Sequence, residues 1–424
     1  MSYGKAIGAA LVLTLAAGTP ASAKKAAKFN HVVVVMMENR SFDHLLGWLP
    51  GANGKQAGVD YPDDLGVLHQ TAELAPDFQG CGRSDPDHSY EGGRIDLNGL
   101  NDGDMKGFLL NTGRATENDD FAIGYYGEDD RPFFNSLALN YTTFDNFFSP
   151  ILAETFPNRI FMHAAQTDRL TNTLTISTLP TIWDRLKAKG VSARYYRSDF
   201  SFLWLWGTKY DSITFSHDRF LQDAKNGTLP RVAFVEPRFA FEEEGFSNDD
   251  HPHADIRAGD AFLAEAFHAV SSGPSWGSTI FIVTYDEWGG FFEHVAPPRA
   301  AAPNDIDMDV NANGKVLLGF RIPVVVASPF TRGDPTSPHV NSTVFDNTSI
   351  LKLIETRWGL APLTARDASS DVGDLTSALN LTAPDRRVPA LPNPAAPTIQ
   401  PCPPKPPSNS EPGLSDLGLL RPGE

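Results

Sequence analysis

Four polar side chains that could bind a metal ion occur as two adjacent pairs, far apart in the sequence. Glu38 and Asn39 follow one apolar segment, and Asp286 and Glu287 follow another. Three carboxylates held close together repel one another and raise each other's pKa unless a cation neutralises them. Carboxylate and amide oxygens suit a divalent cation such as Ca²⁺, Mg²⁺ or Mn²⁺, and Zn²⁺ also accepts carboxylates. The alternative, open for each residue, is an ordinary polar side chain at a helix N-terminus.

A second group of candidates consists of histidines in polar, loop-like contexts. An imidazole near a cation can bind phosphoryl oxygens or protonate a leaving group. Taken singly, each is more simply explained as a solvated or hydrogen-bonding side chain. The candidates are His88, His251, His253 and His294.

Thr155 lies in the segment AETFPNR, residues 153–159, directly before an apolar stretch. A threonine with proline two residues later predicts a helix N-cap. The N-terminus of a helix also favours an alkoxide and an anionic phosphoryl group. A threonine hydroxyl needs activation before it can attack phosphorus, and a bound cation would provide it. The capping role and the nucleophilic role are compatible.

Short apolar segments, interpreted as strands buried on both faces, must position these side chains. Helical patterns accompany them, as at residues 255–270 and 349–358, so we expect an α/β fold with a largely parallel sheet covered by helices. Ligands of such sheets bind at the carboxyl ends of the strands, where polar residues of several strands converge. The predicted strands cover residues 31–37, 232–235, 279–284 and 322–327, and the polar residues that follow them begin at Glu38, Glu236, Asp286 and Ser328.

The charge of the chain bears on its partners. Its 424 residues include 35 basic and 52 acidic side chains, for a net charge of -17. Binding to a phosphate backbone would require a strong basic patch, and no cluster of lysine and arginine supplies one. We therefore expect no nucleic-acid partner.

Both ends of the chain differ from its body. Lys5, the apolar residues 6–17 and the sequence ASA at 21–23 predict a secretory signal peptide over residues 1–23. Residues 384–424 are rich in proline and predict an extended or disordered tail, which leaves residues 24–383 as the folded domain. We expect a secreted or periplasmic protein. Cys81 and Cys402 either form one disulfide or remain separate thiols.

These segments, in this order, resemble the bacterial phosphoesterase family that contains the non-haemolytic phospholipases C, the related acid phosphatases and the plant non-specific phospholipases C. The similarity spans nearly the whole body of the chain. The matching stretches are HVVVVMMENRSFDHLLG at 31–47, TFPNR at 155–159, DHPHAD at 250–255, YDEWGGFFEHVAPP at 285–298, GFRIPVVVASP at 319–329 and DNTSILKLIETRWGL at 346–360.

The resemblance implies an alkaline-phosphatase-like three-layer α/β/α sandwich with a largely parallel sheet and one metal-centred site. Both polar pairs would bind a single divalent metal ion, and Thr155 would be the nucleophile. Histidines would contact the phosphoryl group or the leaving oxygen. The implied set is Glu38, Asn39, Asp286 and Glu287 for the metal, Thr155, His88, His251 and His294 for catalysis, and Asn158 and His253 for substrate binding.

The activity that the resemblance implies is a secreted, metal-dependent phospholipase C that releases diacylglycerol through a phosphothreonine intermediate. A broad acid phosphatase acting on small phosphoesters is the alternative, and a non-catalytic phosphate-binding protein is a third hypothesis. Trp288 and Asn347 stand where family members often carry histidine, which bears on substrate choice. The negative charge favours a zwitterionic head group and at most transient contact with a membrane surface.

Aromatic residues between 200 and 206 have two interpretations. They could line an apolar approach for lipid chains, or they could be ordinary core residues. The residues are Phe200, Phe202, Trp204 and Trp206.

Overall fold

The computed structural model describes Met1 and residues 28–97, 104–110, 120–242 and 244–403. The predicted signal peptide, apart from Met1, and the tail beyond residue 403 lie outside the described residues. No helix in the described part of the chain has the length and hydropathy needed to cross a membrane.

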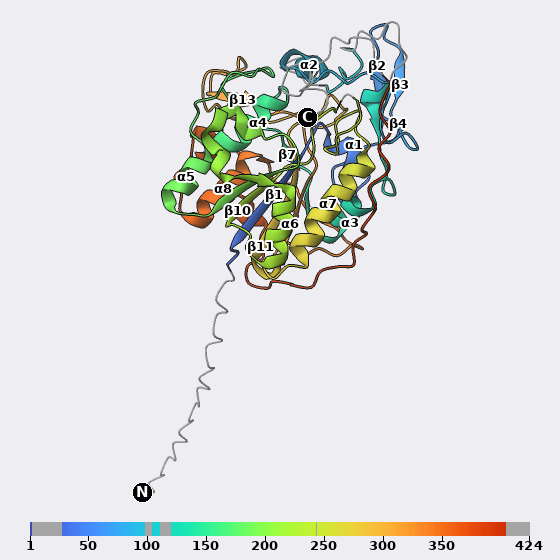
Figure 1. Cartoon of the computed structure of the whole chain (residues 1–424). Helices are drawn as coiled ribbons and strands as arrows, with labels where there is room; N and C mark the ends of the chain where they lie inside the picture. Colours follow the sequence, from blue (N-terminus) through green and yellow to red (C-terminus); the bar gives the residue numbers. More distant parts are fainter. Residues whose placement is uncertain (2–27, 98–103, 111–119, 243, 404–424) are drawn as a thin grey trace.

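An eight-stranded sheet with the order β15-β6-β14-β11-β1-β10-β8-β9 runs through the middle of the protein (Figure 1). Five neighbouring pairs are parallel and two are antiparallel. The prediction of a largely parallel sheet is therefore confirmed. The strands are β1 (His31–Met37), β6 (Thr142–Phe144), β8 (Ala193–Arg197), β9 (Thr214–Ser216), β10 (Val232–Val235), β11 (Thr279–Tyr285), β14 (Val324–Ala327) and β15 (His339–Asn341).

The central strands are held in one register by their apolar, largely β-branched sequences. Strand β1 pairs with β11 along its whole length, from His31 opposite Thr279 to Met37 opposite Tyr285. It pairs on its other side with β10. Nearly every side chain of these three strands is buried, as expected where helices cover both faces. Parallel pairing in this register places the residues that follow β1, β10 and β11 at the same edge of the sheet.

Strand β14 differs from the prediction in its direction. It runs antiparallel to both of its neighbours, β11 and β6. Its carboxyl end therefore lies at the opposite edge of the sheet, where the hydroxyl of Ser328 donates to the carbonyl of Thr279 at the start of β11. The expectation that Ser328 joins the other polar residues was wrong, because an apolar segment does not encode the direction of its strand.

Helices cover both faces of the sheet and complete the predicted three-layer sandwich. Helices α3, α6 and α7 pack together on one face, and α4, α5 and α8 lie on the other (Figure 1). The helices are α1 (Phe42–Leu46), α2 (Tyr90–Asp96), α3 (Pro132–Asn140), α4 (Thr155–Ala164), α5 (Ile182–Lys189), α6 (His217–Asn226), α7 (Ile256–Ser271), α8 (Thr348–Trp358) and α9 (Ala365–Ala368).

Short elements fill the connections. Four two-stranded sheets pair β2 with β3, β4 with β5, β7 with β16 and β12 with β13. Their strands are β2 (Asp60–Pro62), β3 (Leu68–Gln70), β4 (Ala72–Glu73), β5 (Gly124–Tyr125), β7 (Phe147–Phe148), β12 (Arg299–Ala301), β13 (Lys315–Leu317) and β16 (Phe345–Asp346). The 3-10 helices are η1 (Asp120–Ile123), η2 (Phe202–Ile213), η3 (Trp276–Ser278) and η4 (Leu375–Ala378).

The described part of the tail, residues 384–403, is extended and attached to the body. The indole of Trp276 and the imidazole of His268 bond to carbonyls of Arg386 and Pro392, respectively. Cys402 forms a disulfide with Cys81, which decides the alternative that the sequence left open. The bond fixes the end of this segment beside the loop that leads to His88.

One buried histidine gives the fold a testable dependence on pH. His163 of α4 is fully buried among the rings of Trp183, Tyr195 and Phe234, and burial together with the charge of Arg159 lowers its pKa from 6.5 to about 3. Below pH 6.5 His163 becomes protonated in the unfolded chain but stays neutral in the folded chain. The free energy of unfolding therefore falls as the pH falls.

We predict that His163→Phe removes this contribution. Between pH 7 and pH 5 its free energy of unfolding should fall by about 2 kcal/mol less than that of the wild type. Urea unfolding at both pH values measures the difference, and the comparison at pH 7 corrects for altered packing. Equal pH dependence in the two proteins would show that His163 does not titrate as its burial requires.

Candidate active site

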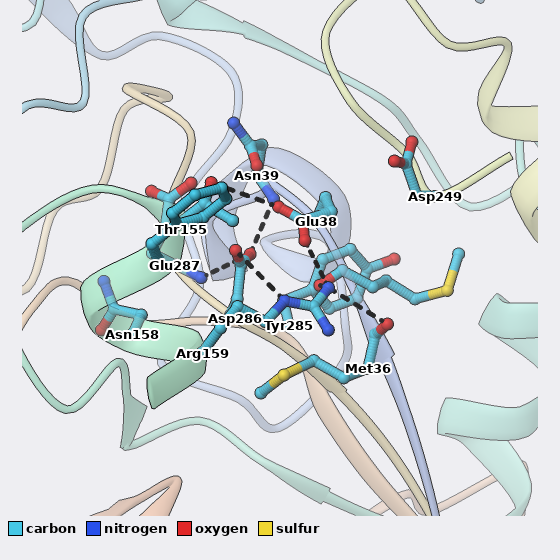
Figure 2. Close-up of polar contacts among 12 residues, drawn as sticks. Met36, Glu38, Asn39, Thr155, Asn158, Arg159, Asp249, Tyr285, Asp286 and Glu287 are labelled. Atoms are coloured by element: carbon cyan, nitrogen blue, oxygen red, sulfur yellow. Dashed lines mark hydrogen bonds and ion pairs between the residues drawn. The ribbon is translucent and has the colours of Figure 1, made fainter. Parts of the chain in front are cut away.

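Glu38 and Asp286 come together because β1 and β11 end in register (Figure 2). The amide of Asp286 donates to the carbonyl of Met37 at 3.1 Å, and the amide of Asn39 donates to Asp286 Oδ1 at 3.1 Å. Glu38, Asn39, Asp286 and Glu287 are all fully buried. The structure therefore brings together the four residues that the sequence proposed as metal ligands.

The amide of Asn39 faces two carboxylates from one side and His88 from the other. With Nδ2 donating to His88 Nε2 at 3.0 Å, the amide oxygen lies 2.8 Å from Glu38 Oε2 and 3.2 Å from Glu287 Oε1. With the amide turned over, its nitrogen donates to both carboxylates instead. The first orientation gathers three oxygens that repel one another unless a cation lies between them. These oxygens fit the donor set of a divalent ion.

A buried carboxylate oxygen without a hydrogen bond and the negative charge of the site both favour a bound divalent ion. Asp286 Oδ2 is buried and has no hydrogen bond among the described residues. Burial raises the pKa of Glu38 well above its usual value; Arg159 opposes this effect, and Asp286 adds to it. One guanidinium thus faces several carboxylates, and the site retains negative charge that a cation would neutralise.

Arg159 is the fixed cation beneath this group. Its guanidinium pairs with Glu38 Oε1, lies 2.6 Å from Glu236 Oε2 through Nη1 and 3.7 Å from Asp286 Oδ2 through Nε. The rings of Phe202 and Phe239 lie 4.5 and 4.9 Å from its central carbon. Arg159 is fully buried, so these carboxylates are held by a side chain that has little freedom to move.

Thr155 is the first residue of α4, one position later than the predicted N-cap. The N-cap residue is Glu154, whose side chain makes no capping hydrogen bond. The Thr155 hydroxyl donates to Glu38 Oε2 at 3.4 Å, so it lies against the same oxygen that faces Asn39. The start of the helix contributes a partial positive charge at this point. The structure thus places the Thr155 hydroxyl beside the proposed metal ligands.

His88 and His251 face the same carboxylates from two loops. His88 Nδ1 donates to the carbonyl of Pro86 at 2.8 Å, and its Nε2 lies 3.8 Å from Glu287 Oε1. His251 Nε2 lies 3.9 Å from Glu38 Oε2. Burial alone would lower the pKa of His251, but the carboxylates of Asp249, Glu38 and Glu242 together outweigh it and hold the pKa well above the usual value.

Two further candidates occupy other positions. His253 Nε2 donates to the backbone carbonyl of Arg83 at 3.1 Å, so His251 is the histidine of this segment that faces Glu38. Asn158 is fully buried, and its amide donates to the carbonyls of Ala153 and Glu154 while its oxygen accepts from the amide of Ile151. All of these bonds hold the loop before Thr155, so Asn158 has a structural role, and its contact with substrate stays a prediction.

His294 also lies outside the group around Glu38. Its Nδ1 pairs with Asp43, and its Nε2 bonds to Asn53 at 3.1 Å. Asp43, Glu293 and His294 are close enough to bind a metal, but Arg321 Nη2 lies 3.1 Å from Asp43 Oδ1 and 2.5 Å from Glu293 Oε1. The single positive charge of Arg321 offsets part of the charge of these two carboxylates. A catalytic role of His294 stays a prediction from the sequence.

Sequence reasoning missed Arg159 and Asp249. Arg159 follows Thr155 by four residues, and this spacing places both on one face of a helix. That spacing was a usable signal. Asp249 had no comparable signal, because its contact with His251 depends on the conformation of a loop.

Comparisons with known proteins identify the class. Residues 29–361 match the model of the Phosphoesterase family. Non-specific phospholipase C1 of Arabidopsis thaliana is 32% identical over 377 residues, which cover 80% of this chain and 68% of that protein. Phospholipase C B of Mycobacterium tuberculosis (strain ATCC 25618 / H37Rv) is 31% identical over 438 residues, which cover 87% of this chain and 80% of that protein. The chain therefore belongs to the Phosphoesterase family, and its phospholipase C homologues indicate a phosphoric ester hydrolase.

Solved structures give a weaker likeness. A protein in the alkaline phosphatase superfamily from Vibrio parahaemolyticus has a TM-score of 0.41 at 11% identity, covering 84% of this chain and 71% of that one. Phosphonate monoester hydrolase of Agrobacterium radiobacter has a TM-score of 0.38 at 10% identity, and the match covers 83% of this chain and 77% of that one. Family membership rests on the sequence comparisons.

Gly289 offers a test of the position of Asn39. Its φ is +63°, and a Cβ added there would lie 2.2 Å from the Asn39 carbonyl oxygen. Gly314 has a φ of +69° and no described atom within 4 Å of such a Cβ. We predict that Gly314→Ala costs only about 1 kcal/mol of backbone strain, whereas Gly289→Ala costs more and displaces Asn39.

Urea unfolding and phosphoester turnover of both variants measure this difference. Gly289→Ala should lose stability and most of its activity, while Gly314→Ala keeps its activity. Equal behaviour of the two variants would contradict the close packing of Gly289 on Asn39.

Proposed function

We propose that the protein is an exported, divalent-metal-dependent phospholipase C that releases diacylglycerol and a phosphorylated head group through a phosphothreonine intermediate. The observation that carries the proposal is the Thr155 hydroxyl, at the start of α4, against the carboxylate of Glu38. The phospholipase C relatives support the reaction class. The predicted signal peptide and the disulfide support export to a secreted or periplasmic location.

The metal in this proposal is one divalent ion held by Glu38, Asn39, Asp286 and Glu287. When bound, it would neutralise the carboxylates and stabilise negative charge on Thr155 and on the phosphoryl oxygens. Ca²⁺, Mg²⁺, Mn²⁺ and Zn²⁺ all accept such oxygen donors, and metal analysis of the purified protein identifies the ion.

In the first step, Thr155 Oγ1 attacks phosphorus in line with the bond to the glycerol oxygen. The hydroxyl proton passes to Glu38 Oε2, which already accepts its hydrogen bond. As the P–O bond breaks, His251 Nε2 gives a proton to the diacylglycerol oxygen. The positive end of α4 favours the negative charge of the phosphoryl group.

In the second step, water attacks the phosphothreonine. One proton of the water passes to His251 Nε2, and the bond between phosphorus and Thr155 breaks. Thr155 Oγ1 regains its proton from Glu38. The sum of the two steps is hydrolysis of one phosphodiester by one water molecule, and each side chain returns to its starting state.

The charge of the chain favours a zwitterionic lipid. The net charge of -17 opposes adhesion to an anionic membrane, so a phosphocholine head group and transient contact with the membrane surface suit this chain better. Phe200, Phe202 and Trp206 are buried, whereas Trp204 is 40% exposed. Of these four aromatic residues, Trp204 is the one available to a lipid chain. A phosphomonoesterase of the acid-phosphatase type is the second candidate, and the names of the phospholipase C relatives favour the first.

We predict that the mature protein hydrolyses p-nitrophenyl-phosphorylcholine faster than p-nitrophenyl phosphate, and that a chelator abolishes both activities. Thr155→Ala should lower turnover by at least about 1,000-fold, because it removes the nucleophile. Thr155→Ser, which keeps a hydroxyl, is the matched control and should retain substantial activity. Mass spectrometry of acid-quenched wild-type enzyme should detect phosphate or phosphocholine on Thr155.

Each contrary result has a distinct meaning. Faster turnover of the monoester would support the phosphatase. Full activity after complete metal removal would reject the metal-dependent reaction. Loss of activity in Thr155→Ser together with absence of a labelled Thr155 would reject the phosphothreonine intermediate. No turnover of either ester with any divalent ion would support the non-catalytic hypothesis.

A further inference from the structure

We infer that Asp249 is a positioning residue that fixes the imidazole of His251 with Nδ1 toward Asp249 and Nε2 toward the leaving oxygen. This inference deepens the proposed function and rests on it. It assigns a role to a buried carboxylate that is not among the proposed metal ligands.

Asp249 holds His251 through both carboxylate oxygens. Oδ2 lies 2.7 Å from His251 Nδ1, and Oδ1 accepts from the His251 backbone amide at 3.1 Å. The hydroxyl of Ser247 donates to the same Oδ1 at 2.7 Å. Asp249 is fully buried, so these bonds are shielded from competing water. A carboxylate in this position keeps a proton on Nδ1 and leaves Nε2 as the nitrogen that can exchange a proton with substrate.

Asp249 also fixes the distance between His251 and the carboxylate of Glu38. Its backbone carbonyl accepts from the amide of Glu38 at 2.8 Å. His251 Nε2 lies 3.9 Å from Glu38 Oε2, the oxygen that accepts from Thr155 at 3.4 Å. The imidazole of His251 and the hydroxyl of Thr155 therefore approach Glu38 Oε2 from different elements. Asp249 bonds both to the backbone amide of Glu38 and to the imidazole.

Other residues hold the backbone of this turn. Arg40 donates to the carbonyl of Asp250 at 2.6 Å and to that of His251 at 2.9 Å. The side chain of Asp250 pairs with Arg131 at 2.8 Å and accepts from the Tyr285 hydroxyl at 2.6 Å. The turn thus keeps its anchors when the Asp249 side chain changes. Asp249→Asn should remove the fixed acceptor of Nδ1 without unfolding the loop.

The proton transfer that depends on this arrangement differs between leaving groups. A diacylglycerol alkoxide must receive the proton of Nε2 as its P–O bond breaks, whereas p-nitrophenolate leaves without one. Misplacing the acid therefore slows hydrolysis of phosphatidylcholine much more than that of p-nitrophenyl-phosphorylcholine.

The experiment measures kcat and KM on these two substrates for four proteins: the wild type, Asp249→Asn, His251→Gln and the double variant. Asp249→Asn should lower kcat about 100-fold on phosphatidylcholine in micelles and tenfold or less on the p-nitrophenyl ester, with KM nearly unchanged. In the His251→Gln background it should add no further loss. Asp255→Asn, in the same segment, is the matched control and should leave the ratio of the two rates unchanged.

Two readouts separate this inference from the proposed function. Equal losses on both substrates, or an added loss in the double variant, would overturn the positioning role while leaving the phospholipase intact. Absence of wild-type turnover would reject the proposed function. Imidazole ¹⁵N NMR tests the orientation without turnover: wild-type His251, assigned by its loss in His251→Gln, should show a protonated Nδ1 that Asp249→Asn alters. An unaltered Nδ1 resonance would overturn the inference.

Discussion

The in-register pairing of β1 with β11 is the constraint on which the rest of the site depends. It brings Glu38 beside Asp286 and directs their carboxylates to one point at the edge of the sheet. The pairing itself is stabilised by buried apolar side chains, about 25 cal/mol for each Å² removed from water. A shift of one residue would turn every side chain of β1 to the other face and separate the two acids.

Bringing several carboxylates together has an electrostatic cost, and Arg159 offsets part of it. Burying an unpaired charge is strongly unfavourable, whereas a guanidinium that bonds to two or three carboxylates favours their charged form and holds them in place. Because Arg159 lies one helical turn after Thr155, the docking of α4 fixes the counter-ion and the hydroxyl together. A divalent ion would neutralise the remaining negative charge.

The loops around this centre are held by unusually specific contacts. Asp249 links the Glu38 backbone to His251, Arg40 holds the same turn by two carbonyls, and the disulfide anchors the loop that precedes His88. Such bonds orient imidazoles to within hydrogen-bonding geometry, which apolar packing of a loop alone does not do. Polar contacts also fix His294, but Asp43 and Asn53 hold it away from the group around Glu38.

The sequence by itself determined the α/β architecture, the strands that end just before Glu38 and Asp286, and the helix that begins beside Thr155. These features follow from short-range patterns of apolar and polar residues. Only the tertiary structure decided that β14 runs antiparallel, that Asn158 holds a loop, that His251 rather than His253 faces Glu38, and that Cys81 pairs with Cys402. Those outcomes depend on strand direction and on contacts between residues distant in sequence, and neither is encoded in the local pattern of side chains.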